Sequence, residues 1–300
     1  KMILEKAHDV DFRRVDDLSS IYCAEVEMLL REQKGKKALE LLRDVCIAPP
    51  SHVRVSRSAP AQERLFRSTK LWCLLADLEE SFGDIQGVRA AYDSMIDLKV
   101  ATPLVILNYA QFLEENNYFE DSFRAFERGV DLFEYPYSLE IWMMYITKFV
   151  KRYKGEKVER TRDIFEQAIE TVPPAYAKTL YIMYADFEEK FGLARHAMSV
   201  YERATRAVPN EEKYIMFLLY IARATDFFGV SRAREIYEKA IATLADEHME
   251  DICLRYANME KNLGEVDRAR VIFTYCSNFC DPRHKQHFWQ TWHNFEVNYG

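Results

Sequence analysis

Residues 181–204 read YIMYADFEEKFGLARHAMSVYERA, and this succession of residue types returns about every 36 residues along the chain. Each copy has an aromatic or large apolar residue, a small residue, a glutamate, a glycine, and then a second aromatic followed by Glu-Arg-Ala or a variant of it. In the quoted copy these are Tyr181, Ala185, Glu188, Gly192 and Tyr201 to Ala204. The period is too short for a domain and long enough for two helices, so it predicts a helical solenoid.

The second aromatic, or an apolar residue in its place, marks each copy: Leu4, Leu42, Tyr92, Phe126, Phe165, Tyr201, Tyr237 and Phe273. Apolar residues fall at helical spacing before and after the glycine, which indicates two amphipathic helices per copy. One hairpin cannot bury its apolar face alone. We therefore predict an all-α solenoid of about sixteen helices in stacked antiparallel pairs, with a right-handed superhelical twist.

Glycine and proline mark the expected helix ends. The first helix of a copy stops at an apolar residue followed by Gly83, Gly192, Gly229 or Gly264, which suits a left-handed residue beyond the helix end. New helices are expected to start at Thr102-Pro103 and at Asp281-Pro282.

The copies give the expected domain organisation, a single solenoid over residues 1–300 without a linker. Both ends cut through a copy, so we expect a fragment of a longer array. The predicted segments are 1–12 (end of a preceding repeat), the repeats 14–48, 70–100, 101–135, 136–172, 173–208, 209–245 and 246–281, the first helix of a further repeat at 282–300, and an inserted loop at 47–69.

Composition excludes several classes of protein. The net charge of -7 argues against a surface that coats nucleic acid. The sequence contains no run of 18 apolar residues and no signal peptide, so nothing in it indicates a membrane protein. The six cysteines are typical of reduced, intracellular thiols. We find no phosphate-binding glycine loop and no nucleophile with plausible partners, so we expect no enzyme, no cofactor and no small-molecule substrate.

The glutamates at Glu79, Glu188, Glu260 and Glu296 recur in register with the repeat, which favours a structural role. We expect each to pair with the basic residue ten positions later, as Glu260 with Arg270 or Glu79 with Arg89. The other positions assigned to the repeat are Trp72, Gly83, Tyr92, Phe126, Trp142, Phe165, Gly192, Tyr201, Gly229, Tyr237, Gly264, Phe273 and Trp289.

One cluster has zinc-type ligands: Cys276, Cys280, His284 and His287. The expected helix start at Asp281-Pro282 places the two pairs on different helices. We therefore favour two core thiols and two surface histidines, and predict no metal.

Two basic stretches are candidate partner-binding sites. The first surrounds the Gly155 turn and contains Lys148, Lys151, Arg152, Lys154, Lys157, Arg160 and Arg162, of which Lys151, Arg152 and Lys154 are the candidates. A solvated turn is the alternative to contact with RNA or an acidic protein.

The second stretch is the inserted loop, with Arg54, Arg57, Arg64 and Arg67. We expect it to lie outside the core and to dock an acidic partner or an RNA backbone, with a tolerated surface insertion as the alternative.

The repeats resemble HAT repeats, the tetratricopeptide relatives found in RNA-processing proteins. Several stretches further resemble the SYF family of pre-mRNA-splicing factors, called XPA-binding protein in animals: Leu71–Glu80, Asn108–Glu115, Gly192–Met198, Gly264–Arg270, Phe288–Trp292 and Phe295–Val297. Ala197-Met198 and Tyr22 depart from the family pattern, where Ala-Arg and Trp are common.

The resemblance implies a nuclear, non-enzymatic scaffold of the spliceosome and the C-terminal part of the family's array. It also implies membership of the NineTeen complex, a crooked-neck-type HAT protein as partner, RNA contact within the assembled complex, and in animals a link to transcription-coupled repair. A HAT scaffold for 3′-end cleavage or ribosomal RNA processing is the alternative.

Overall fold

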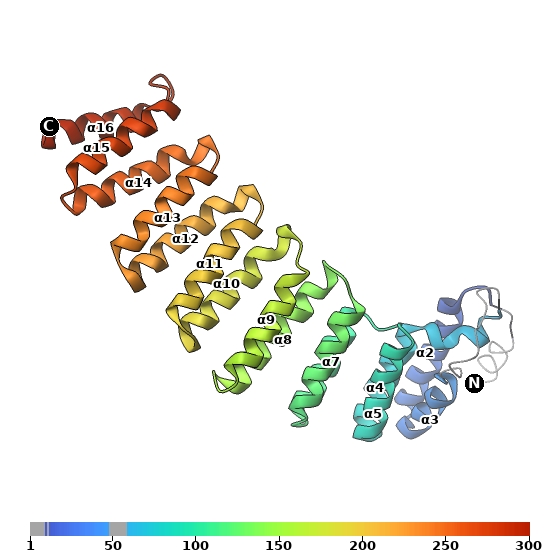
Figure 1. Ribbon diagram of the computed structural model, residues 1–300. Coiled ribbons are helices and arrows are strands. Elements are labelled where there is room, and N and C mark those ends of the chain that lie inside the picture. The colour runs from blue at the N-terminus through green and yellow to red at the C-terminus, as the bar shows by residue number, and fades with distance from the viewer. Residues whose placement is uncertain (1–9, 11, 48–58) are drawn as a thin grey trace. The chain divides into compact units, whose positions relative to one another are not determined.

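The computed structural model describes residue 10, residues 12–47 and residues 59–300. Its described part contains helices and no strand (Figure 1). The α-helices are α2 (Val15–Arg31), α3 (Gly35–Val45), α4 (Thr69–Phe82), α5 (Ile85–Asp97), α6 (Pro103–Glu115), α7 (Phe119–Leu132), α8 (Tyr137–Tyr153), α9 (Val158–Glu170), α10 (Pro174–Phe191), α11 (Ala194–Ala207), α12 (Asn210–Phe228), α13 (Val230–Thr243), α14 (Met249–Asn262), α15 (Val266–Cys276) and α16 (Gln286–Tyr299). Short 3₁₀ helices are η1 (Gln62–Arg67), η2 (Asp246–His248) and η3 (Ser277–Phe279).

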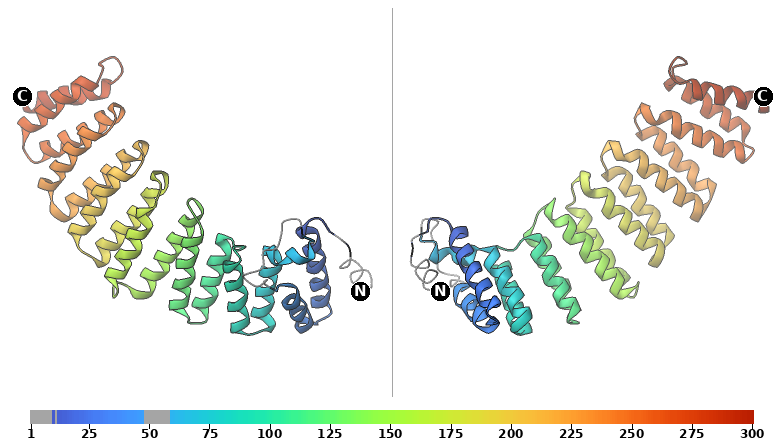
Figure 2. Two further views of the ribbon diagram at one scale, coloured as in Figure 1. Left: turned by 45° about the vertical axis from the view of Figure 1, so that its right-hand side comes forward. Right: turned by 180° about the vertical axis from the view of Figure 1, so that it is seen from behind.

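The chain forms two compact units, residues 1–147 and residues 148–300, which divide within α8. Inside each unit, consecutive helices pair into antiparallel hairpins, such as α4 with α5 or α10 with α11, and each hairpin packs against the next (Figure 2). The prediction of an all-α solenoid of helical hairpins is confirmed. The repeat boundaries and the handedness of the twist stay predictions.

Helix starts follow the sequence signals at one predicted position and not at the other. Thr102 caps α6 by accepting a hydrogen bond from the Val105 amide, and Pro103 occupies the first helical position. The predicted start at Asp281-Pro282 is wrong. Asp281 accepts backbone hydrogen bonds from His284 and Lys285 in a turn, and α16 begins only at Gln286.

The core is built around aromatic pairs that join one hairpin to the next. In each, the second aromatic of a repeat stacks on an aromatic from the first helix of the following repeat. Tyr237 and Tyr256, for example, have ring centroids 4.8 Å apart and planes within 2°. The other pairs are Tyr92–Tyr109, Phe126–Tyr145, Phe165–Tyr184, Tyr201–Tyr220 and Phe273–Trp292. The repeating aromatic thus belongs to the junction between two hairpins.

Tryptophans and the residues before the glycines complete the packing. Trp72 and Trp142 are buried, and the Trp289 indole donates to the Cys280 carbonyl at 3.0 Å. Phe82 and Phe191 lie over Gly35 and Gly155 of the preceding turns, so closely that a Cβ at either glycine would meet the ring at 2.5 or 2.7 Å.

Among the described residues, no helix combines the length and the apolar character that crossing a membrane requires.

Replacement of Tyr237 by Ala should cost about 3–5 kcal/mol locally, because it removes a buried ring from a stacked pair. Because repeats are stabilised by their neighbours, amide exchange measured by mass spectrometry should accelerate in α12 and α14 as well as in α13. The matched control is Tyr275→Ala, since Tyr275 is 43% exposed. Acceleration confined to α13 would contradict the coupling.

Candidate functional site

The recurring glutamates form ion pairs that join consecutive hairpins. Glu188 on α10 is fully buried, and its carboxylate accepts two hydrogen bonds from Arg162 on α9, at 2.6 Å from Nε and 2.8 Å from Nη2. This paired geometry satisfies a charge that burial would otherwise penalise. We call the recurring set the junction ion pairs: Arg43–Glu79, Arg162–Glu188, Arg234–Glu260 and Arg270–Glu296.

The predicted partners of these glutamates are wrong. Each glutamate pairs with an arginine of the preceding hairpin, so Arg270 bonds Glu296 and not Glu260, and Arg89 bonds Asp121 instead of Glu79. The side chain ten positions later belongs to the same hairpin, and it extends toward the next one. The pKa of the Arg162 guanidinium is raised, first by its hydrogen bonds to Glu188.

Two glycines of the repeat make room for the carboxylates of Glu79 and Glu188. A Cβ at Gly83 or Gly192 would lie 1.9 Å from an oxygen of Glu79 or Glu188. The predicted left-handed conformation is wrong at these two positions, where φ is -100° and -105°. It is correct at Gly264, where φ is 81° and a Cβ would have open space.

At the junction between α11 and α12 neither member of the ion pair is present. Met198 and Ala224 lie 36 positions after Arg162 and Glu188 in the repeat register, and both are buried. The departure from Ala-Arg at Ala197-Met198 is therefore matched by an apolar residue at the glutamate position. A paired apolar replacement avoids leaving a buried charge without a partner.

A second series of contacts links the second helices of consecutive repeats. The acid that follows the aromatic of one repeat binds the base two positions after the aromatic of the next. Glu166 on α9 binds Arg203 on α11 through two hydrogen bonds of 2.7 Å. The other pairs of this second-helix ladder are Asp93–Arg128 and Glu202–Lys239. This ladder was not predicted from the sequence, although the Tyr-Glu-Arg-Ala motif contains both the acid and the base that form it.

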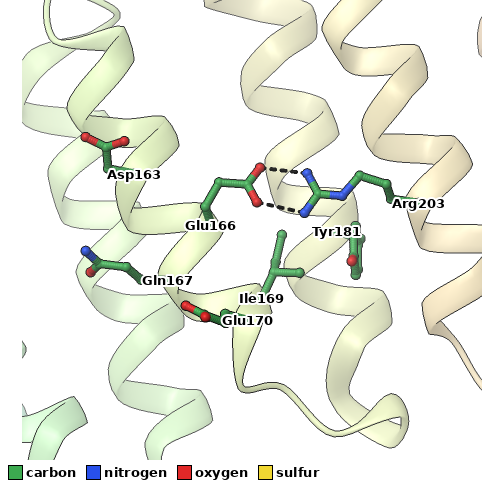
Figure 3. Close-up of a pocket in the computed structure, with 7 residues that line it drawn as sticks. All are labelled: Asp163, Glu166, Gln167, Ile169, Glu170, Tyr181 and Arg203. Atoms are coloured by element: carbon green, nitrogen blue, oxygen red, sulfur yellow. Dashed lines mark hydrogen bonds and ion pairs between the residues drawn. The ribbon is translucent and has the colours of Figure 1, made fainter.

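Figure 3 shows the groove that this ladder borders in the second unit. Glu166 lies opposite Arg203 across the groove, and Tyr181 comes from α10. The cavity measures about 550 Å³ and is lined by Asp163, Glu166, Gln167, Ile169, Glu170, Tyr181 and Arg203. Three carboxylates against one guanidinium make its lining acidic. The hydrogen bonds from Arg203 lower the pKa of Glu166 below its usual value.

The inserted loop is only partly described. Arg54 and Arg57 lie outside the described residues. Arg64 donates from Nη2 to the Arg13 carbonyl at 3.0 Å, and the guanidinium of Arg67, an exposed residue, lies over the Phe66 ring.

The expectation that the loop lies outside the core is wrong for its second half. Ala61 and Leu65 are buried, and the Trp72 indole donates to the Phe66 carbonyl at 2.8 Å. The apolar residues of η1 pack against α2 and α4. This part is thus a component of the first unit.

The junction ion pairs also correct the length of the insertion. Arg43 and Glu79 are 36 positions apart, whereas the other three pairs are 26 apart. The difference between 36 and 26 gives ten inserted residues. Because the arginine lies three positions before the aromatic in the other pairs, the aromatic position of this repeat is held by Cys46, which is buried.

Some charged side chains of the basic turn contact other residues, and two form no ion pair with a described residue. The Lys157 ammonium lies 3.9 Å from the centre of the Tyr153 ring, and Arg162 belongs to a junction ion pair. Arg152 is exposed and already has an interaction partner. Lys151 and Lys154 are exposed and form no ion pair with any described residue.

The cysteine and histidine cluster is split between core and surface. The thiols of Cys276 and Cys280 are buried with sulfur atoms 3.6 Å apart, while His284 and His287 are exposed. No group of three or more metal-ligating side chains is arranged to hold an ion within the described ranges. Burial raises the pKa of the Cys280 thiol to about 12.

Comparison with known proteins gives consistent matches. The family model described as the pre-mRNA-splicing factor Syf1/CRNKL1 C-terminal HAT repeat matches residues 1–300. Pre-mRNA-splicing factor SYF1 of Homo sapiens is 53% identical over 301 residues and that of Rattus norvegicus 52% identical over 301 residues, each match covering 100% of this chain and 35% of the relative. Pre-mRNA-splicing factor cwf3 of Schizosaccharomyces pombe is 46% identical over 302 residues, covering 100% of this chain and 38% of the relative. The chain therefore spans little more than a third of these relatives.

Replacement of Arg162 by Met should destabilise the second unit by about 3–5 kcal/mol, because it leaves the buried Glu188 carboxylate unpaired. The double variant Arg162→Met/Glu188→Ala copies the natural Met198 and Ala224 junction and should recover most of the loss. Urea unfolding measures both. Arg195→Met, at an exposed arginine that forms no ion pair with any described residue, is the control. A double variant no more stable than the single one would contradict the role of the charge.

Acid should weaken the second-helix ladder. A carboxylate with a pKa lowered by folding contributes stability above its unfolded pKa of about 4.3, and this stability is lost as pH falls through the folded pKa. Glu166→Gln should therefore be less stable than the native chain at pH 7, by roughly 0.2–1 kcal/mol because the pair is half exposed, and the difference should vanish toward pH 3. Thermal melts across pH measure it. Glu170→Gln, at an exposed acid of the same helix, is the control; a difference constant with pH would contradict the assignment.

Proposed function

Because the chain belongs to the Syf1/CRNKL1 C-terminal HAT-repeat family, we propose that it acts as a non-enzymatic scaffold for protein–protein interaction in pre-mRNA splicing. The single observation that supports this most is the similarity to splicing factors over the whole of this chain. The proposal places the protein in the nucleus. NineTeen complex membership, a crooked-neck-type HAT partner, RNA contact in the assembled complex and a link to transcription-coupled repair are further parts of it, based on the resemblance.

The chemistry of the described residues supports a scaffold. The charged side chains that recur are paired with one another across the junctions, as Glu188 is with Arg162 and Glu166 with Arg203. Such pairs hold one repeat against the next and leave no recurring group for catalysis. Binding capacity then depends on side chains that do not repeat, because these are free of the structural role.

The basic turn supplies such side chains. Lys154 has a left-handed conformation with φ of 43°, and the adjacent Gly155 has φ of 87°. The Phe191 ring packs on Gly155 and fixes the turn from the following repeat. Lys154 therefore presents its charge from a defined turn, and Lys151 presents a second charge from the end of α8; neither forms an ion pair with a described residue. We assign this turn, together with Arg152, as a docking point for an acidic segment of a splicing protein.

Affinity purification of the full-length protein followed by mass spectrometry tests the proposed role. We expect splicing proteins to co-purify, and they should be lost when residues 1–300 are deleted. Co-purification of 3′-end cleavage or ribosomal RNA processing proteins in their place would overturn the proposal.

The charge-reversing variant Lys151→Glu/Lys154→Glu should leave the melting temperature unchanged, because neither lysine has an ion-pair partner among the described residues. It should weaken co-purification of one splicing partner by about tenfold, more at low salt than at high salt. Lys36→Glu/Lys37→Glu makes the same charge change at two exposed lysines of α3 and serves as the control. Equal recovery of partners with both variants would contradict a docking role.

A further inference from the structure

A second pocket lies one repeat after the groove of Figure 3 and differs from it in charge. It is formed by α11, α12 and α13 and measures about 350 Å³. Its lining consists of Glu202, Thr205, Arg206, Lys213, Phe217, Tyr220, Lys239 and Thr243. Three cations and one carboxylate give the lining a net charge of +2, in a chain whose net charge is -7.

The single carboxylate of this pocket is already paired with two of the three cations through its Oε1 atom. Glu202 accepts a hydrogen bond from Lys239 at 2.7 Å and another from Arg206 at 3.0 Å. Lys213 forms no ion pair with any residue in the described part of the chain. The pocket therefore has more positive charge than its own side chains can neutralise.

A buried hydroxyl in the same pocket also lacks an acceptor. At other junctions the tyrosine of the first helix donates to the acid that follows the preceding aromatic, as Tyr145 does to Glu127 at 2.8 Å. Tyr220 is 1% exposed, and its hydroxyl donates to no acceptor among the described residues, while the Arg232 guanidinium lies near its oxygen. Burial raises the pKa of Tyr220 more than the nearby Arg232 lowers it, so the hydroxyl remains a donor. An unsatisfied buried donor beside cations is a site for an anion.

We propose that this pocket binds the side-chain carboxylate of an acidic segment in a protein partner, with Lys213 and Lys239 pairing the charge and Tyr220 donating a hydrogen bond. The assignment takes the nature of the partner from the proposed scaffold role. A carboxylate entering between the two lysines supplies the acceptor that Tyr220 lacks.

The same surroundings disfavour a nucleic acid. Proteins that hold single strands offer exposed aromatic faces on which bases stack. Phe217 and Tyr220 are both buried and offer none. The adjoining groove, lined by Asp163, Glu166 and Glu170, would repel a row of phosphates.

The test uses purified full-length protein and a fluorescein-labelled hexaglutamate peptide with capped ends, and it measures binding by fluorescence anisotropy. Lys213→Gln should weaken binding by about tenfold, which is the effect of removing one charge from a charge-assisted contact. Tyr220→Phe should weaken binding several-fold while leaving the melting temperature unchanged or slightly raised, because its hydroxyl donates to no acceptor among the described residues. Lys190→Gln, at an exposed lysine of α10, should bind like the native protein.

Peptide binding that Lys213→Gln and Tyr220→Phe leave unchanged would overturn the assignment. So would binding of single-stranded oligouridine with the same dependence on Lys213, since the ligand would then be phosphate. The titration contains no splicing component. Its failure would overturn the assignment of the pocket as a carboxylate site, whereas the splicing role is tested separately by co-purification.

Discussion

A buried carboxylate must have a partner, and this requirement determines how the hairpins join. Glu188 is fully buried at the end of α10, and its partner Arg162 comes from the preceding hairpin. The glycine after the helix is required by the same group, because a Cβ at Gly192 would collide with the carboxylate. Arginine, glutamate and glycine of the repeat therefore serve one contact. Where Met198 replaces the arginine, Ala224 replaces the glutamate, which is what the cost of an unpaired buried charge demands.

The Tyr-Glu-Arg part of the motif joins its hairpin to the hairpins before and after it. Tyr201 stacks on Tyr220 of the following repeat, Glu202 binds Lys239 of that repeat, and Arg203 binds Glu166 of the preceding one. Each residue of Tyr-Glu-Arg thus contacts a different hairpin from its own. Nearest-neighbour contacts of this kind explain why a repeat of two helices is stable in an array and not alone.

Binding then depends on side-chain groups that the contacts between repeats leave without a partner among the described residues. Among the described residues, Lys151 and Lys154 of the basic turn and Lys213 of the pocket formed by α11, α12 and α13 have no ion-pair partner, and the Tyr220 hydroxyl of that pocket donates to no acceptor. Both are local excesses of positive charge or donor capacity on an acidic chain. Binding at the basic turn needs no change in the contacts between repeats, because Lys151 and Lys154 form no ion pair with any described residue.

The sequence by itself determined the all-α hairpin repeat, the family and the structural character of the glutamates, because each depends on a period that repeats along the chain. It also indicated Thr102 as a cap, since a cap is a local interaction. Only the tertiary structure decided which arginine each glutamate pairs with and that Leu65 of the inserted loop is buried. It also showed that glycine is needed at position 83 because a Cβ would collide with Glu79, and not because the backbone is left-handed. It also revealed the buried Tyr220 hydroxyl, which donates to no acceptor among the described residues. These depend on contacts between separate hairpins, and spacing within one hairpin carries no information about the side chains that the next one brings.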